Sequence, residues 1–343
     1  MSLELTIVVP AFNEAPRLAD GMRRFDAAVA EGAVDLERTE VLVIDDGSTD
    51  ATASTARALL SHLPHHRVVS LPANRGKGSA VRTGISLARG ACTAYMDADM
   101  AIDPRAIPRL LSALDTTEVA IGSRALADSM VDGTYAIRAV MGRLFNRMVT
   151  TGTGLDLHDT QCGFKAFRTP AARLLFHLVR IDRFAFDVEV LARAGRLGLQ
   201  VTEIPVHWKH VPGSSIHPLH DSFTMLGDVY RSRLGLLPAP PVPGMVVRDP
   251  SDPGGTAKLA QRVADVVSVT LGGLPVPVVV DGPSVIVLLP LVEPAESATV
   301  ATAVRAEFDG LPVARQSFTI EGLCALGPLA GRLGTYPASG GRP

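Results

Sequence analysis

Residues 5–122 alternate between short runs rich in Val, Ile and Thr and longer segments with a helical period. Apolar runs of this length indicate strands that are buried on both faces, and the intervening helices indicate that neighbouring strands run parallel. The expected strands are 5–9, 40–44, 67–71, 91–96 and 118–122, and the expected helices are 16–31, 49–61, 78–89 and 104–114. The alternation therefore predicts an α/β fold, with a mostly parallel sheet flanked by helices.

The composition changes near residue 237 and indicates a second, smaller domain. A chain of 343 residues is longer than one hydrophobic core usually serves. Residues 238–255 are rich in Pro and Gly, which predicts a stiff linker after a first domain at 1–237. Residues 256–335 are expected to form a small α+β domain, and the glycine-rich end at 336–343 is expected to be disordered.

The sequence of the second domain contains no motif that indicates a catalytic or metal-binding site. It has no cluster of acidic, histidine or cysteine residues, so regulation, dimerisation and partner docking all remain open as its role. Its expected helices are 257–264, 294–308 and a short one after residue 320, and its expected strands are 266–271, 276–280, 285–289 and 314–320.

Composition excludes several classes of protein. A net charge of −2 argues against non-specific nucleic-acid binding, and three distant cysteines suggest neither a disulfide framework nor a structural zinc site. Prolines and Asp281 interrupt the longest apolar stretch, 271–292, so no segment is expected to span a membrane. The N-terminus lacks the pattern of an export signal, which predicts a cytoplasmic protein. The sequence carries no signal for an oligomeric state.

Two carboxylates, Asp97 and Asp99, directly follow the expected strand 91–96. A strand that ends in D-x-D delivers hard oxygen ligands to its carboxyl end, where a divalent cation can bridge them to a diphosphate. Short acidic pairs also occur as plain turn or capping residues. The residues after the other strands decide between these readings, because ligands of such sheets bind beyond the carboxyl ends of the strands.

The other strand ends are polar as well. Pro10 to Glu14 follow the first strand and Asp45 to Asp50 follow the second. Helix capping explains Ser48 and Asp50, but it leaves Asp45 and Asp46 to accept hydrogen bonds from a nucleobase or a ribose. Four strand ends are thus expected to meet in one crevice.

The third strand is followed by Gly76-Lys77-Gly78, which matches neither common phosphate loop. A P-loop needs Gly at position 71, where this chain has Leu71, and the dinucleotide fingerprint needs Gly or Ala at position 81, where it has Val81. The sequence therefore argues against a P-loop nucleotidase and against a dehydrogenase.

The motifs VVPAFNE, VIDDGSTD, NRGKGSAVRTG, MDADM and IGSR stand in the order found in family-2 glycosyltransferases of the GT-A fold, which the chain resembles over residues 4–237. Within that family, DTQCGFKAF, FAFDVEVL and EIPVHWKHVPGSS are most similar to polyprenyl-phosphate sugar synthases, especially the dolichyl-phosphate glucosyltransferase branch. The resemblance implies an inverting hexosyltransferase that uses Mg²⁺ or Mn²⁺ to move glucose from UDP-glucose to a polyprenyl phosphate.

The resemblance also implies roles for individual residues. Asp97 would lie beside the ribose and the metal, and Asp99 would bind the metal directly. Arg124 would contact the sugar diphosphate or the acceptor phosphate, because a guanidinium donates hydrogen bonds in pairs. The implied nucleotide-sugar pocket contains Pro10, Ala11, Phe12, Glu14, Asp45, Asp46, Lys77, Asp97, Ala98, Arg138 and Lys209.

The acceptor side is implied less directly. Gln161 and Asp187 would border the sugar and the acceptor, and Arg138 would help to hold the acceptor anion. An ionised lipid phosphate is already a nucleophile and needs no strong base, whereas a hydroxyl acceptor would make Asp187 the obvious general base.

Two positions depart from the family pattern. Mannosyl-phosphate synthases tend to carry Gln where this chain has Ala101, which favours the glucosyl branch. The late loop often ends in Ser-Lys, but here it ends in Ser214-Ser215, and Lys209, His210 or His217 can supply the missing cation.

Residues 222–237 form an amphipathic pattern that suits either a membrane surface or packing on the domain itself, so peripheral contact with the inner face of a membrane is one expectation. Other functions also remain open: GDP-mannose as the donor, a soluble hydroxyl acceptor, or a binding protein with a silenced transferase fold. A sugar nucleotidyltransferase usually begins with a glycine-rich loop, which residues 10–16 lack.

Overall fold

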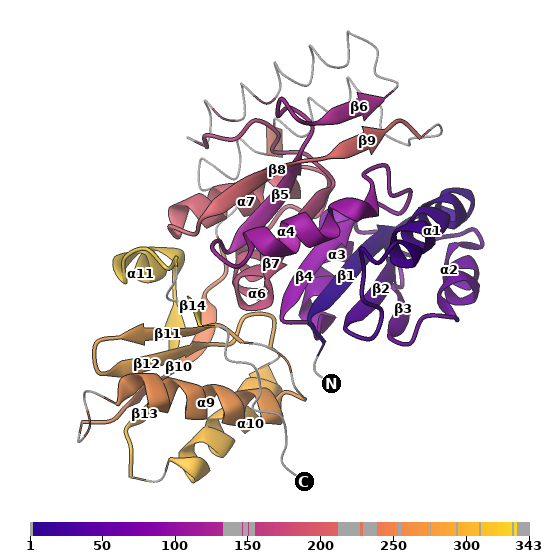
Figure 1. The fold of residues 1–343 in the computed structure, drawn as a ribbon. Coiled ribbons are helices and arrows are strands. Elements are labelled where there is room, and N and C mark those ends of the chain that lie inside the picture. The colour runs from indigo at the N-terminus through magenta and orange to yellow at the C-terminus, as the bar shows by residue number, and fades with distance from the viewer. Residues whose placement is uncertain are drawn as a thin grey trace.

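The structure, a computed structural model, describes residues 3–132, 155–211, 239–250, 255–272, 276–292, 294–308 and 310–330, together with residues 146, 150, 227, 228, 252, 274, 333 and 334. Two sheets dominate the fold, a large one in the N-terminal part of the chain and a smaller one in the C-terminal part (Figure 1). Arg138, Ser214, Ser215, His217 and most of segment 222–237 lie outside the described residues, so their predicted roles stay predictions.

Seven strands form the larger sheet, in the order β3-β2-β1-β4-β7-β5-β8. Neighbouring strands are parallel except where β7 pairs with β4 and β5. The predicted mostly parallel α/β sheet is confirmed, and the first five strands begin and end within two residues of the expected positions. The strands are β1 Leu5–Ala11, β2 Thr39–Asp45, β3 His66–Ser70, β4 Cys92–Met96, β5 Val119–Ser123, β7 Phe164–Arg168 and β8 Val201–Pro205.

Helices cover both faces of this sheet (Figure 1). Alternate residues of β1 serve the two cores: Ile7 packs with Met22 of α1 on one face, and Val8 packs with Ile85 of α3 on the other. Burial on both faces is the reason why the strands read as continuous apolar runs. The helices are α1 Ala15–Ala30, α2 Thr52–Leu60, α3 Lys77–Leu87, the short 3₁₀ helix η1 Pro104–Ala106, α4 Ile107–Ala113, α6 Thr169–Leu178 and α7 Phe186–Arg196.

The antiparallel strand β7 lies between β4 and β5. Met96, the last residue of β4, pairs with Phe164, the first residue of β7. Because the two strands run in opposite directions, the chain that enters β7 lies beside the carboxyl end of β4. This arrangement brings residues 161–163 next to the D-x-D.

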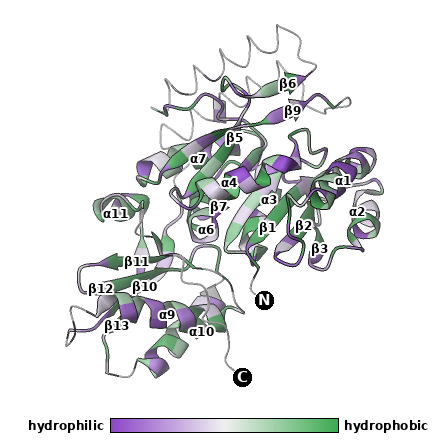
Figure 2. Cartoon of the chain, in the orientation of Figure 1, coloured by the Kyte–Doolittle hydropathy of each residue, from purple (hydrophilic) through white to green (hydrophobic). Residues whose placement is uncertain are grey.

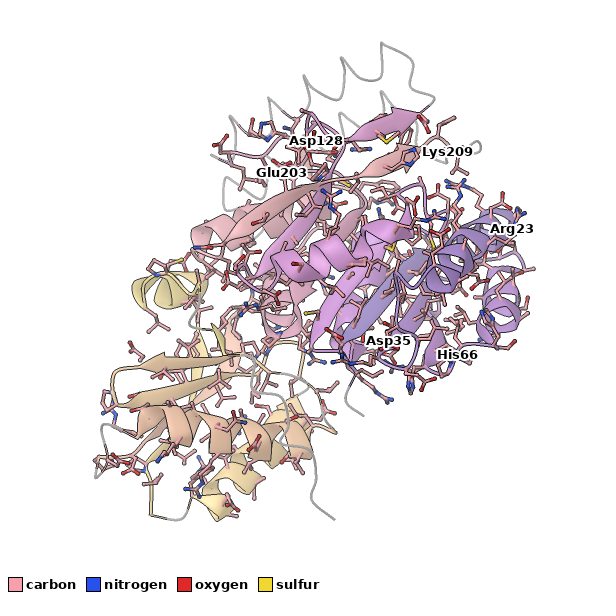
Figure 3. All side chains as sticks on the ribbon, in the orientation of Figure 1. Arg23, Asp35, His66, Asp128, Glu203 and Lys209 are labelled. Carbon is pink, nitrogen blue, oxygen red and sulfur yellow. The ribbon has the colours of Figure 1, made fainter. Side chains whose placement is uncertain are left out.

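A small two-stranded ribbon lies beside the loop that follows β4. It consists of β6 Met130–Asp132 and β9 His207–Lys209, which run parallel. The backbone N–H of Lys209 donates to the carbonyl of Ala101 at 2.8 Å. Figure 3 shows the side chain of Lys209 on this ribbon.

The C-terminal sheet has five antiparallel strands in the order β13-β10-β12-β11-β14. Helices α9 and α10 pack on one of its faces, and their core includes Val263, Val267 and Val304. The α+β character that was expected is therefore present. The elements are β10 Val242–Arg248, α9 Thr256–Thr270, β11 Val278–Asp281, β12 Ser284–Leu288, α10 Pro294–Glu307, β13 Val313–Phe318, α11 Ile320–Ala325 and β14 Leu333–Gly334.

Two expectations for this part of the chain are wrong. Residues 242–248, assigned above to the linker, form β10 between β13 and β12. Prolines hid a period of two, in which Val242 and Val246 face one core while Met245 and Val247 face another. Residues 266–271 were expected to be a strand, but α9 continues to Thr270 because its apolar face repeats with the helical period.

The other face of the C-terminal sheet packs on the larger domain. Ile286 and Leu288 of β12 belong to the same hydrophobic cluster as Leu175 and Phe176 of α6. Figure 2 shows the strands of both sheets mainly in the hydrophobic colour, whereas hydrophilic residues recur along α1. Among the described residues, no helix has the length and the apolar character that crossing a membrane requires.

Candidate active site

The loops after β1 and β2 are joined to each other by hydrogen bonds. Asn13, whose φ is +53°, donates its N–H to Ser48 Oγ at 2.9 Å and accepts from the N–H of Thr49 at 2.9 Å. The N–H of Glu14 donates to Thr52 Oγ1 at 2.8 Å. These bonds fix the start of α1 relative to α2, so both loops form one rigid edge of the site.

Asp97 of the D-x-D faces Lys77 at the start of α3. Lys77 Nζ lies 2.6 Å from Asp97 Oδ1. Burial lowers the pKa of Lys77, but the carboxylates of Asp97 and Asp187 outweigh burial and hold that pKa well above its ordinary value. Lys77 is therefore charged at neutral pH and pairs with Asp97. The sequence had placed both residues in the site, and the structure brings them together.

Asp99, the second carboxylate of the D-x-D, is paired with Arg17. The guanidinium of Arg17 contacts Asp99 Oδ2 and also lies 2.8 Å from Glu14 Oε1. Asp99 is 8% exposed, and its Oδ1 accepts the N–H of Ala101 at 3.0 Å. The sequence interpretation missed Arg17. Its position three residues after Glu14 in a helix was the available signal, because residues at that spacing lie on one face.

Burial raises the pKa values of both carboxylates that Arg17 contacts. Burial and the charge of Asp97 raise the pKa of Asp99 above its ordinary value. Burial also raises the pKa of Glu14, to about 7, although Arg17 opposes this shift. Carboxylates in such surroundings favour additional positive charge nearby.

Asp45 and Asp46 are buried, and their carboxylates hold loops. Asp45 Oδ1 accepts the N–H of Ser48 at 3.0 Å. Asp46 Oδ2 accepts the N–H groups of Arg75 at 3.2 Å and Gly76 at 2.7 Å, which shapes the turn before Lys77. Burial raises the pKa of Asp46. Their contact with a base or a ribose remains a prediction beside this loop-holding role.

The segment before β7 closes the site on the side of Asp97. A Cβ atom at Gly163 would lie 2.1 Å from Asp97 Oδ2, so the backbone can approach the carboxylate only because residue 163 is glycine. Gln161 lies two residues earlier, and its N–H donates to Asp159 Oδ1 at 3.3 Å. Gln161 thus lies in the segment that approaches Asp97, and its contact with the sugar and the acceptor stays a prediction.

Arg124 is held by Asp159. The Nε and Nη2 groups of Arg124 donate to the two oxygens of Asp159 at 2.7 and 3.0 Å, and the N–H of Arg124 adds a third bond at 3.0 Å. Although burial opposes the shift, Arg124 lowers the pKa of Asp159 below its ordinary value. The side chain of Arg124 remains 36% exposed. Asp159 was not among the predicted site residues.

Asp187 is buried beneath the site, in the first turn of α7. Its Oδ1 lies 2.5 Å from Lys165 Nζ and accepts the hydroxyl of Tyr95. Lys165 is fully buried and also donates to the carbonyl of Cys162 at 2.7 Å. Asp187 is 4% exposed, and its carboxylate already has two partners. The geometry therefore favours a structural role for Asp187 over that of a free base.

The remaining predicted pocket residues lie at strand ends. Pro10 and Ala11 end β1, and Ala98 lies between the two acidic residues; all three are buried. Phe12, by contrast, directly follows β1 and is 42% exposed. The backbone of Lys209 is joined to the loop after the D-x-D by the bond to Ala101 described above, and contact of its side chain with a ligand stays a prediction.

The carboxylates of the site suit a divalent cation whose coordination shell is completed by a substrate or by water. Asp97 and Asp99 supply the carboxylate oxygens that Mg²⁺ and Mn²⁺ prefer. Glu14 Oε2 is buried and has no hydrogen-bond partner, which fits an anionic pocket that awaits positive charge. No group of three or more potential ligands from His, Cys, Asp and Glu is present in the described part of the chain. The other coordination positions would therefore fall to substrate oxygens or water.

Comparison with known proteins agrees with this architecture. Residues 6–176 match the family described as Glycosyl transferase family 2. The dolichyl-phosphate beta-glucosyltransferase of Dictyostelium discoideum is 34% identical over 250 residues, which cover 69% of this chain and 76% of that protein. The enzyme of the same name from Drosophila melanogaster is 36% identical over 244 residues, covering 67% and 74%. The one from Homo sapiens is 33% identical over 250 residues, covering 68% and 76%.

Solved structures show the same fold. Glucosyl-3-phosphoglycerate synthase from Mycobacterium tuberculosis, in complex with Mn²⁺, UDP and phosphoglyceric acid, has a TM-score of 0.51 at 21% identity and covers 73% of this chain and 84% of that one. This likeness supports the GT-A fold for the mostly parallel sheet of this chain. The matched family, its dolichyl-phosphate beta-glucosyltransferase relatives and this fold together show that the chain is a hexosyltransferase and belongs to glycosyl transferase family 2.

Proposed function

We propose that the protein transfers glucose from UDP-glucose to the phosphate of a polyprenyl phosphate, with inversion at the anomeric carbon. The names of the relatives support this choice of sugar and acceptor. Direct displacement forms the bond from a phosphate oxygen of the lipid to the anomeric carbon, and it breaks the bond from that carbon to the diphosphate. The products are a glucosyl polyprenyl phosphate and UDP.

The pairing of the site carboxylates carries this proposal. Asp97 faces Lys77, Asp99 faces Arg17, and Asp187 faces Lys165, so each of the three is engaged by a cation. A hydroxyl acceptor needs a base that takes its proton. A phosphate acceptor is already ionised and needs none. Because Asp97, Asp99 and Asp187 are all paired, these three carboxylates favour a lipid phosphate over a sugar hydroxyl as the acceptor.

The donor diphosphate would bind at the D-x-D. Asp97 and Asp99 would hold Mg²⁺ or Mn²⁺, and the cation would supply charge stabilisation to the departing nucleoside diphosphate. Lys77 and Arg124 are the cationic side chains that would contact phosphate oxygens. Phe12 would contact the nucleobase with its exposed ring.

The acceptor would approach from the side of the β6–β9 ribbon, where Lys209 offers positive charge and His210 offers a ring nitrogen that can form a hydrogen bond. A polyprenyl phosphate resides in a membrane, so the protein would work as a peripheral enzyme at the membrane surface. An amphipathic segment such as 222–237 suits that contact.

The test measures UDP or GDP release from UDP-glucose and GDP-mannose with Mn²⁺ or Mg²⁺, with and without a polyprenyl phosphate. We expect lipid-dependent UDP release and a glucosylated lipid by mass spectrometry, both abolished by EDTA. Asp99→Ala should lower the rate by about 10²-fold or more. Asp20→Ala, which removes a half-exposed carboxylate of α1, is the matched control and should leave the rate unchanged. Lipid-dependent GDP release would identify GDP-mannose as the donor in place of UDP-glucose. Release at the same rate with and without the lipid would overturn the acceptor assignment.

A further inference from the structure

Arg17 pairs with Asp99, a carboxylate that would otherwise be open to a metal ion. Its guanidinium contacts Asp99 Oδ2 with one nitrogen and Glu14 Oε1 with the other, at 2.8 Å for the latter. Arg17 is the first residue of α1 after Pro16 and lies in a helix whose start is fixed by the bonds between the β1 and β2 loops. The arginine is thus held at the site and is not a solvated surface residue; its side chain is 20% exposed.

The pair of Arg17 and Glu14 is incompletely satisfied. Arg17 Nε and Glu14 Oε2 are both buried, and neither has a hydrogen-bond partner in the described structure. Buried polar groups are nearly always paired in native proteins, so an orphaned donor beside an orphaned acceptor indicates that a ligand completes the site. A donor N–H would bind an anionic oxygen, and a carboxylate oxygen would bind a cation or a hydroxyl group.

The charges of the site indicate which ligands would complete it. Three carboxylates, Glu14, Asp97 and Asp99, face two cations, Arg17 and Lys77. A divalent cation that arrives alone meets Asp97 and Asp99 already paired, and it is repelled by Arg17 and Lys77 at short range. A nucleoside diphosphate brings negative charge that can accept hydrogen bonds from Arg17 while the metal takes the carboxylates.

We propose that Arg17 is an internal counter-cation that competes with the divalent metal for Asp99 and passes to the donor diphosphate when metal and nucleotide bind together. This inference rests on the proposed function, because it assumes a metal and a nucleoside diphosphate at the D-x-D. Arg17 is thereby a positioning residue that makes metal binding depend on the nucleotide. The consequence is that the carboxylates stay paired, and the metal stays weakly bound, until a donor is present.

Metal binding alone provides the decisive readout. Free Mn²⁺ is measured by electron paramagnetic resonance during titration of the full chain, with and without UDP. For the wild type we expect UDP to tighten Mn²⁺ binding by about tenfold or more, within the usual range of coupling between two ligands. For Arg17→Gln we expect Mn²⁺ alone to bind about fivefold tighter than it binds to the wild type, and the effect of UDP to fall to about twofold.

The controls separate loss of charge from loss of structure. Arg23→Gln removes an exposed arginine of the same helix that pairs with Asp20, and it should leave both constants unchanged. Figure 3 shows Arg23 on the outer side of α1. Arg17→Lys keeps the charge but loses the forked geometry, so its Mn²⁺ affinity without UDP should lie between those of the wild type and Arg17→Gln. Thermal unfolding of each variant checks that the fold is retained, and Arg17→Lys serves as the test if Arg17→Gln does not fold.

The outcomes distinguish this inference from the proposed function. If Arg17→Gln binds Mn²⁺ alone as weakly as the wild type or more weakly, Arg17 does not compete with the metal, and the inference falls while the proposed function stands. If the wild type binds no Mn²⁺ even with UDP present, the metal part of the proposed function and the inference fall together. Failure of transfer to the lipid phosphate, with the Mn²⁺ results as expected, overturns the acceptor alone.

Discussion

The ammonium of Lys165 lies 2.5 Å from the carboxylate of Asp187, and both groups are buried beneath the D-x-D. Tyr95 donates its hydroxyl to the same carboxylate, and Lys77 is close enough for Asp187 to raise its pKa. The pair therefore connects the core under β4 and β7 to the cation that holds Asp97. A buried pair of this kind fixes geometry, and its removal should be felt mainly as a loss of stability.

Lys165→Met is expected to lower the free energy of unfolding by about 3–5 kcal/mol, because it leaves the carboxylate of Asp187 buried without a cation. The double variant Lys165→Met with Asp187→Asn should lose less than the sum of the two single variants, since no unpaired charge remains. Urea unfolding of the four proteins provides the comparison. Arg196→Met, at an exposed pair with Glu321, is the control and should cost less than about 1 kcal/mol. Additive losses in the double variant would contradict the pairing.

Gly163→Ala is expected to lower kcat/KM by about 10²-fold, because the added methyl group would push Asp97 from its position and small displacements at a site have large effects. The Cβ atom of an alanine at this position would lie 2.1 Å from Asp97 Oδ2. Gly195→Ala is the matched control, since its Cβ would meet nothing nearer than 3.6 Å and should leave the rate unchanged. Steady-state UDP release checks both variants. An active Gly163→Ala enzyme would show that the backbone can retreat from Asp97.

His177 is expected to make stability depend on pH below about 6.5, its ordinary pKa in the unfolded chain. Its Nε2–H donates to the carbonyl of Pro241 at 3.0 Å, and its Nδ1 accepts the N–H of Leu291 at 3.2 Å, so the ring is neutral in the folded protein. Burial lowers the pKa of His177, and Arg180 and Arg82 lower it further. The unfolded state therefore binds more protons as pH falls, and the folded state loses stability.

The measurement for His177 is urea unfolding at pH 7.5, 6.0 and 5.0. The wild type should lose more stability over this range than His177→Gln, which retains a donor and an acceptor but does not titrate, with a slope of up to about 1.4 kcal/mol per pH unit. Parallel curves for the two proteins would assign the pH dependence to other groups.

The chain cut after residue 237 is expected to be insoluble or unfolded. The C-terminal sheet and α11 cover an apolar face of α6 and α7 (Figure 1), and an exposed patch of that kind promotes aggregation. Soluble yield, size-exclusion chromatography and thermal unfolding of the cut chain and the full chain provide the test. A cut chain that is monomeric and cooperatively folded would show that the C-terminal part is a separable module. The C-terminal part contributes the following buried residues to the hydrophobic cluster that it shares with α6 and α7: Val242, Val279, Ile286, Leu288, Phe318, Ile320, Leu323, Leu329 and Leu333.

The sequence predicted the features that depend on local pattern. The periods of apolar residues placed the first five strands, and the position of Asp97 and Asp99 after one of them marked the candidate site. Such signals are readable because burial on two faces leaves a continuous apolar strand and because strand ends are polar only where a loop or a ligand needs them. Where prolines or β-branched residues masked the period, as in β10 and the end of α9, the prediction was wrong.

By itself, the sequence determined the kind of sheet, the order of its motifs and the edge at which they meet. Only the tertiary structure decided which charges face each other: Arg17 with Asp99, Lys77 with Asp97, and Lys165 with Asp187. Period and motif report on the backbone near a residue, whereas an ion pair joins side chains that are many residues apart and depends on the strand order, with β7 inserted between β4 and β5. That order follows from the packing of the whole domain, and no local pattern contains it.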